Sequence, residues 1–111
     1  MLNQSATLDP VFRALGDPTR RMMVERLSHG SASVSELAAP LEMSLPAVLQ
    51  HLTVLESCGL VRTKKIGRTR RCHLESSAMS SAEAWFAGQR AQWEERLDRL
   101  AYVLAEDEQG N

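Results

Sequence analysis

The sequence predicts a mainly α-helical fold with one small β-hairpin, and three observations lead to this class. Helix start and stop signals recur along residues 9–57. At residues 60–75 the apolar pattern changes from helical spacing to the alternation of strands. A segment without proline, with apolar residues at helical spacing, then runs to about residue 105.

Composition limits the class of protein before any motif is considered. The 111 residues are 43% hydrophobic, 24% charged and 5% aromatic, as in an ordinary globular domain, and we expect one domain over residues 1–111. No apolar run approaches the length of a membrane span, and residues 1–7 lack the basic start and apolar stretch of a signal peptide. We therefore expect a cytoplasmic protein without membrane contact.

Two short helices are predicted at the start of the chain. Asp9 can cap a helix whose first residue is Pro10, which predicts a helix over residues 9–15. Asp17 and Pro18 repeat the pattern and predict a second helix that ends near residue 28. Proline suits the first helical position because its missing N–H would have no helical partner there.

A third and a fourth helix are predicted next, separated by a turn over residues 42–44. Ser33 and Glu36 form a capping-box pattern, which begins the short third helix. Ser44 caps the fourth helix, over residues 45–57, and the opposite faces of this helix are apolar and neutral polar. Two short helices joined by a tight turn, the second with a free polar face, are typical of a helix-turn-helix.

A β-hairpin is predicted over residues 60–75. Gly67 and Arg68 suit a two-residue type II′ turn between the strands, and this turn sets the register. Directly opposed like charges destabilise a hairpin, so an anionic partner would relieve the conflict that this register creates. The alternative is a solvated basic loop. The opposed pairs are Lys64 with Arg71 and Lys65 with Arg70.

Charge is segregated along the chain despite a net charge of −1. Residues 45–75 carry six Lys and Arg against two Asp and Glu, whereas residues 76–111 carry three against seven. All six cations of the middle segment lie between Arg62 and Arg71. A local cluster of this kind is the electrostatic pattern of a surface that binds nucleic acid.

A long C-terminal helix is predicted over residues 80–105, with residues 106–111 as a disordered tail. A helix of this length exceeds what so small a domain can cover, so we expect it to pair with a second copy of the chain. Phe12 and Leu15 of the first helix are placed in the same interface. The alternative is burial of the apolar stripe within the chain. The stripe consists of Phe86, Trp93, Leu97, Leu100 and Leu104.

In this order, the elements resemble the ArsR (SmtB-type) family of bacterial winged helix-turn-helix repressors. Residues 14–20 resemble the entry to the family's second helix, and residues 35–38 resemble its first helix-turn-helix element. Residues 46–56 are similar to its recognition helix and residues 59–74 to its wing. The resemblance implies a winged helix-turn-helix with residues 9–75 as the DNA-binding core and residues 80–105 as the dimerisation helix.

The implied function is that of a homodimeric repressor of transcription, which binds double-stranded DNA at a palindromic operator through helix 45–57 and wing 60–75. The family's metal sites have no counterpart, because residues 33–41 lack cysteine and residues 76–111 lack histidine. We therefore expect no metal and no cofactor, and a metal-independent member whose effector is a small molecule, a redox signal or absent.

The candidate DNA-binding residues fall into three groups. Gln50 and Thr53 are the candidate base readers, because their side chains suit the edges of bases in the major groove. Leu45 and Leu49 stand on the same helix where the family usually has polar residues. Candidates for phosphate and minor-groove contacts are Lys64, Lys65, Arg68, Arg70 and Arg71 on the wing. The remaining candidates are Ser35, Ser44, Pro46 and His51.

Two other interpretations of the sequence compete with that of a simple DNA-binding regulator. Cys58 and Cys72 fit small buried hydrophobic residues, but a redox pair would make the protein a thiol-responsive regulator. A dimeric interaction module that has lost operator reading is favoured by Leu45 and Leu49 and opposed by the wing cations. An enzyme is not expected, because the sequence has no converging set of nucleophile, base or metal ligands.

Overall fold

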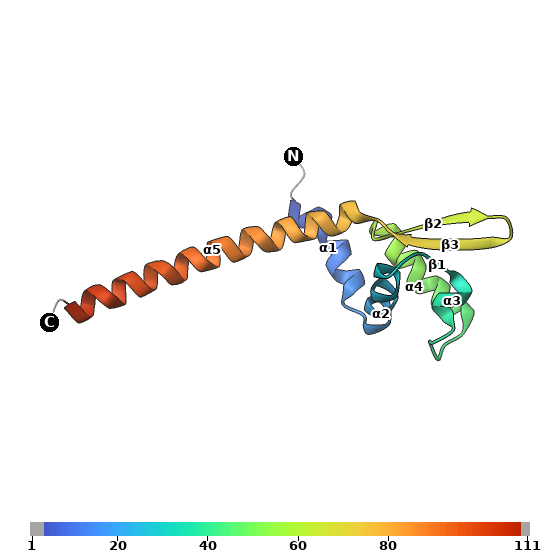
Figure 1. Cartoon of the computed structure of the whole chain (residues 1–111), viewed down its shortest axis with the longest axis horizontal. Coiled ribbons are helices and arrows are strands. Elements are labelled where there is room, and N and C mark those ends of the chain that lie inside the picture. Colours follow the sequence, from blue (N-terminus) through green and yellow to red (C-terminus); the bar gives the residue numbers. More distant parts are fainter. Residues whose placement is uncertain (1–3, 110–111) are drawn as a thin grey trace. The chain divides into compact units, whose positions relative to one another are not determined.

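The structure, a computed structural model, describes the backbone of residues 4–109 and the side chains of residues 8–109. It divides into two compact units, Met1–Ser81 and Ala82–Asn111, which are described separately. The mainly helical fold with a small antiparallel sheet is confirmed (Figure 1). Its elements are α1 (Gln4–Leu15), α2 (Pro18–Ser28), β1 (Ala32–Ser33), α3 (Val34–Ala38), α4 (Leu45–Ser57), β2 (Val61–Ile66), β3 (Thr69–Leu74) and α5 (Ser76–Gln109).

Side-chain caps begin the three helices around the helix-turn-helix, as the sequence predicts. Asp17 caps α2 by accepting a hydrogen bond from the Arg20 N–H at 3.0 Å. Ser33 and Glu36 form the full capping box of α3. The Ser44 hydroxyl accepts from the Ala47 N–H and caps α4. These contacts are local in sequence, and they fix the residue at which each of the three helices begins.

The hydrophobic core of the first unit lies between α1, α2, α3, α4 and the sheet. On α4 the inward residues are Val48, Leu52 and Leu55, which a helical projection places on one face, and each is at most 3% exposed. This burial leaves the other face of α4 toward solvent. The buried core residues are Val11, Ala14, Met23, Leu27, Ala32, Leu37, Val48, Leu52, Leu55, Leu60, Val61 and Cys72.

The hairpin has the predicted register, including Lys64 opposite Arg71 and Lys65 opposite Arg70. Gly67 has a φ of 63° and no non-glycine residue among those described has a positive φ, in agreement with a type II′ turn. The sheet also contains β1, which pairs with β3 and gives the order β1-β3-β2. β1 was not predicted from the sequence, because two residues are too short for an alternating pattern.

Four predicted boundaries are wrong. α1 begins at Gln4 instead of residue 9, so that Pro10 lies inside the helix, because burial of Leu8 holds the earlier turn against the core. The turn between α3 and α4 spans residues 39–44 instead of 42–44, because α3 stops at Ala38, just before Pro40.

The third boundary is the start of α5 at Ser76 instead of residue 80, where Ala78 and Met79 pack against the core. The fourth boundary is the end of α5. The helix continues to Gln109 instead of residue 105, so residues 106–109 of the expected tail are helical. Residues 110 and 111 lie outside the described residues. No glycine or proline occurs between Gly88 and Gly110 to stop the helix earlier.

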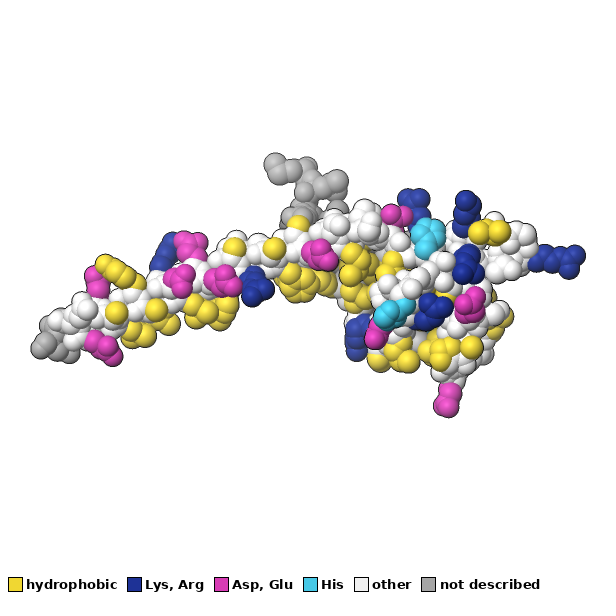
Figure 2. Space-filling view, viewed as in Figure 1, with side chains coloured by type: hydrophobic (Ala, Val, Ile, Leu, Met, Phe, Trp, Pro, Cys, Tyr) yellow, Lys and Arg dark blue, Asp and Glu magenta, His cyan; other side chains and the backbone are white. Residues whose placement is uncertain are grey.

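The second unit is the helical segment from residue 82 onward. Figure 2 shows hydrophobic side chains along the lower side of this segment. Two ion pairs at i,i+4 spacing, Arg90 with Glu94 and Arg99 with Glu95, lie on its surface. Within residues 4–109, no helix is long and apolar enough to cross a membrane.

Candidate nucleic-acid interface

The exposed face of α4 mixes apolar and polar side chains. Leu45 is 53% exposed at the start of the helix, and Leu49 is half-buried one turn later. Gln50 and Thr53 are exposed on the same helix. The Thr53 hydroxyl donates to the Leu49 carbonyl at 2.9 Å, so its hydrogen is directed to the helix backbone. Its methyl group and an acceptor lone pair remain for an external contact.

Three other candidate residues of the helix-turn-helix, Ser35, Ser44 and Pro46, are also exposed. Ser35 and Pro46 are exposed at the starts of α3 and α4. Ser44 is exposed, but its hydroxyl already serves as the cap of α4. Of these positions, Ser35 lines a groove of about 490 Å³ between α3, α4 and the wing, together with Leu45 and Leu49.

The half-buried His51 is directed toward α2. Its Nδ1 lies 3.2 Å from the Arg20 guanidinium and 3.9 Å from the Asp17 carboxylate. Arg20 also donates to the Ala14 carbonyl at 2.6 Å. When Arg20 donates to Nδ1, that nitrogen is unprotonated, so the second ring nitrogen carries the hydrogen. These contacts join the end of α1, the start of α2 and the middle of α4.

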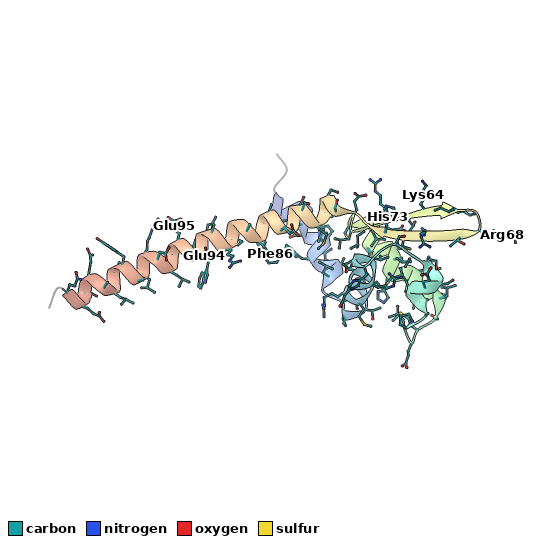
Figure 3. The ribbon with its side chains drawn as sticks, viewed as in Figure 1. Lys64, Arg68, His73, Phe86, Glu94 and Glu95 are labelled. Carbon is teal, nitrogen blue, oxygen red and sulfur yellow. The ribbon has the colours of Figure 1, made fainter. Side chains whose placement is uncertain are left out.

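Three wing cations extend into solvent without an ion pair among the described residues: Lys64, Lys65 and Arg68. Figure 3 places Arg68 at the tip of the hairpin and Lys64 on β2, and Figure 2 shows Lys and Arg side chains along the hairpin and at its tip. Arg70 instead donates to Glu56 at 3.2 Å and to the Thr63 hydroxyl at 3.1 Å. Part of the predicted repulsion between the strands is therefore relieved inside the protein, by a carboxylate of α4.

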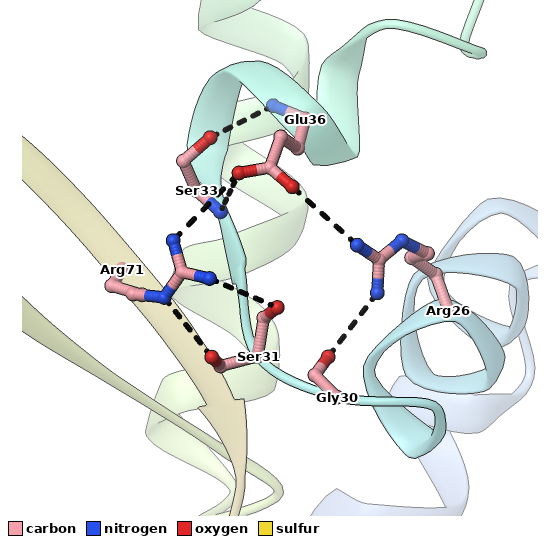
Figure 4. Close-up of polar contacts among 6 residues, drawn as sticks. All are labelled: Arg26, Gly30, Ser31, Ser33, Glu36 and Arg71. Atoms are coloured by element: carbon pink, nitrogen blue, oxygen red, sulfur yellow. Dashed lines mark hydrogen bonds and ion pairs between the residues drawn. The ribbon is translucent and has the colours of Figure 1, made fainter.

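Arg71 is also engaged within the protein, in the cluster drawn in Figure 4. Its guanidinium donates to the Ser31 hydroxyl at 3.0 Å and lies 3.7 Å from the Glu36 carboxylate. The other carboxylate oxygen of Glu36 lies 3.5 Å from Arg26 on α2. From the sequence, Glu36 is predicted only as a capping residue, because its contacts with Arg26 and Arg71 depend on β1 and β3 being neighbours.

The contacts of Glu36 predict a pH-dependent stability. Hydrogen bonds from Ser33, followed by the charges of Arg71 and Arg26, hold the pKa of Glu36 below its ordinary value of 4.5. Because the pKa in the folded state is the lower one, this stabilisation is present above pH 4.5 and is lost as the pH falls through the folded value. We expect Glu36→Gln to show a smaller loss of melting temperature than the wild type on acidification from about pH 5 to 3.

Thermal unfolding at a series of pH values measures this difference. Glu25→Gln is the matched control, since Glu25 is exposed on α2 and has no ion pair among the described residues. Parallel pH profiles for Glu36→Gln and the wild type would show that the carboxylate contributes nothing to this dependence.

The two cysteines have different surroundings. Cys72 is fully buried in the sheet, and burial raises the pKa of its thiol. Cys58 is half-buried at the end of α4, where its thiol donates to the Leu55 carbonyl at 3.3 Å. A raised pKa lowers the thiolate fraction, which disfavours Cys72 as a reactive group. The redox role stays a prediction.

The predicted dimer residues have exposed or half-buried side chains within the chain. Phe12 and Leu15 are half-buried on α1. In the second unit the stripe along α5 is exposed, with Trp93 at 60%, Leu97 at 46% and Leu100 at 54%. Phe86 and Leu104 are 57% and 55% exposed. Phe86 also packs edge-to-face with Trp85 at a centroid distance of 5.2 Å. Among the described residues, no three metal-ligating side chains lie together.

The arrangement has close counterparts among known proteins. Residues 17–63 match the family model of the arsR family of bacterial regulatory proteins. The HTH-type transcriptional regulator Rv2034 of Mycobacterium tuberculosis is 44% identical over 73 residues, 66% of this chain and 68% of that relative. The transcriptional repressor SdpR of Bacillus subtilis is 24% identical over 78 residues, 70% of this chain and 87% of that relative.

A solved structure of an ArsR family regulator is also similar to this chain. The crystal structure of the ArsR family transcriptional regulator RHA00566 has a TM-score of 0.78 and 46% identity, and the match covers 85% of this chain and 97% of that one. The relatives are transcriptional regulators, so the expectation that this chain is not an enzyme agrees with its family. The resemblance noted in the sequence is confirmed: the chain belongs to the ArsR family of bacterial regulatory proteins and is a helix-turn-helix transcriptional regulator.

Proposed function

We propose that the protein is a homodimeric repressor that binds a palindromic operator through α4 and the β2–β3 wing, in the bacterial cytoplasm. One observation carries the proposal: an exposed α4 lies beside a hairpin whose outer cations have no carboxylate partner among the described residues. A helix of this kind enters the major groove, while a basic wing contacts the backbone or minor groove. Repression is the activity named for the relative SdpR.

The candidate residues receive separate roles. Gln50 reads a base edge, and Thr53 contacts a base through its methyl group or its free lone pair. Lys64, Lys65 and Arg68 attract phosphates. We assign Arg70, Arg71 and His51 to positioning, because each is bonded to another element of the first unit. Ser35, which lines the groove, and the exposed Pro46 at the start of α4 are assigned to contacts with the DNA backbone.

Dimerisation is supported by the exposed stripe of α5. The stripe residues recur at spacings of 7, 4, 3 and 4, which is the pattern of a coiled-coil seam. A seam that is about half exposed in one chain would be buried against the same seam of a second copy. Phe12 and Leu15 are assigned to the same interface.

Binding to DNA tests the proposal. Fluorescence anisotropy would compare DNA from upstream of the protein's own gene with scrambled DNA at two salt concentrations. A preference of about 10³-fold or more for the upstream DNA supports an operator-specific regulator. Equal and weak binding to both would favour the interaction module instead, to which the exposed Leu45 and the internal pairing of Arg70 and Arg71 already lend support.

The wing cations that have no ion pair among the described residues predict how DNA affinity depends on salt concentration. Lys65→Ala or Arg68→Ala should weaken binding to operator and scrambled DNA equally and lower the slope of log affinity against log salt by about one, because each removes one phosphate contact. Arg62→Ala is the matched control: it removes the same charge from β2, but Arg62 pairs with Glu75 at 2.7 Å. A loss confined to one operator sequence would contradict the assignment to phosphates.

A further inference from the structure

The first turns of α4 offer hydrocarbon at the place where a base-reading helix usually offers hydrogen-bonding groups. Leu45 and Leu49 are one turn apart on the same face, and Leu45 is 53% exposed although it is a large apolar side chain. Both line the groove of about 490 Å³ beside the wing. Its walls include Val34 and Ser35 of α3 and Arg68 and Arg70 of the wing. The groove therefore has an apolar floor and a cationic side.

Few hydrogen-bonding groups compete with this apolar floor. The Thr53 hydroxyl donates its hydrogen to the Leu49 carbonyl, and His51 is directed to Arg20. Ser44 is occupied as the helix cap. Within the described residues, Gln50 is the side chain on the exposed face of α4 that retains all its donors and acceptors. The two side chains of α4 that line the groove, Leu45 and Leu49, therefore offer only methyl, methylene and methine groups to a base.

Unmodified DNA displays one methyl group in the major groove, the 5-methyl of thymine, and apolar side chains recognise it by direct contact. Arg68 on the side of the groove, which has no ion pair among the described residues, can attract a phosphate of the strand that carries this base. We propose that the groove receives a thymine-bearing strand and that Leu45 and Leu49 read thymines through their 5-methyl groups. This inference rests on the proposed function, because it assumes that α4 lies in the major groove of an operator.

The experiment removes the methyl group and nothing else. Duplexes selected by the full-length protein from random DNA would first define the half-site, in which we expect thymines at two or more positions. Each thymine would then be replaced singly by deoxyuridine, with a thymine outside the half-site as control. Because burying one such carbon is worth about 0.8 kcal/mol, we expect each contacted methyl to contribute about fourfold in affinity.

Variants of the exposed Leu45 connect this effect to the protein. Leu45→Ala should weaken binding to the thymine duplex and lose the preference over deoxyuridine at one position of the half-site. Leu45→Met, which keeps an apolar side chain of similar volume, should retain that preference. Leu45 is exposed, so both variants are expected to keep the wild-type melting temperature within the error of the measurement.

The outcomes separate this inference from the proposed function. A selected half-site at which every deoxyuridine substitution binds as tightly as thymine would overturn methyl reading and leave the operator-binding regulator intact. A preference that persists in Leu45→Ala at every position would remove Leu45 as the reader. Selection that yields no preferred sequence would overturn the proposed function and the inference together.

Discussion

Leu97→Glu is expected to convert the proposed dimer into monomers and to lower the affinity for a palindromic operator by about 100-fold or more, because binding of the two half-sites is no longer linked. Leu97 lies in the middle of the stripe on α5, where a glutamate would face its own copy across the seam. Two carboxylates in an apolar seam are costly, since neither has a cationic partner there. Sedimentation and anisotropy would measure the two effects on the same samples.

A matched control is available on the same helix. Tyr102 is 67% exposed and lies on the opposite side of α5 from the stripe, by helical projection. Tyr102→Glu introduces the same charge without placing it in the seam, so it should leave both the mass and the affinity of the dimer unchanged. The seam assignment is wrong if the two variants behave alike, or if Leu97→Glu sediments as a dimer.

Leu55→Ala is expected to destabilise the first unit by about 2–5 kcal/mol, because Leu55 is fully buried in the core and its truncation leaves a cavity. For a domain of this size the melting temperature should fall by about 10 °C or more. Circular dichroism at the helical band would follow the transition.

Leu45→Ala provides the comparison, since it makes the same chemical change on the same helix at an exposed position. Its free energy of unfolding should change by no more than about 0.5 kcal/mol. The pair separates the two faces of α4: one variant loses stability, and the other keeps stability and loses DNA affinity. Similar melting temperatures for the two variants would contradict the burial pattern.

Local signals explain which parts of the fold could be predicted. The caps at Asp17, Ser33 and Ser44 act within three residues, and Gly67 sets a two-residue turn, so the sequence alone located these elements and the hairpin register. The missed elements depend on tertiary contacts. The early turn of α1 depends on the burial of Leu8, and β1 depends on pairing with β3.

In the candidate site, too, features set by local sequence could be predicted, and features set by tertiary contacts could not. Helical periodicity alone identified the exposed face of α4 with Gln50 and Thr53, whereas Leu45 was singled out because the family usually has a polar residue at that position. In the sequence the wing cations form one group, whereas in the structure Arg70 and Arg71 differ from the others because they pair with Glu56 and Glu36. Those pairs join residues far apart in the chain, and no pattern of spacing reveals them. Contacts with DNA stay predictions for every residue of the site.

The carboxylate of Glu36 has a mechanical consequence for the wing. It joins α2 and β3 through Arg26 and Arg71, and Arg70, the second residue of β3, is joined to α4 by Glu56, so other elements hold the hairpin as far as Arg70. Beyond these contacts, residues 66–69 make no hydrogen bond or ion pair outside the hairpin within the described chain. Because no such contact in the described chain restrains residues 66–69, we expect these residues to move more than the rest of the wing. We therefore expect the spacing between α4 and the part of the wing held by Arg70 and Arg71 to stay nearly constant, and adaptation to DNA grooves of different width to be confined to residues 66–69.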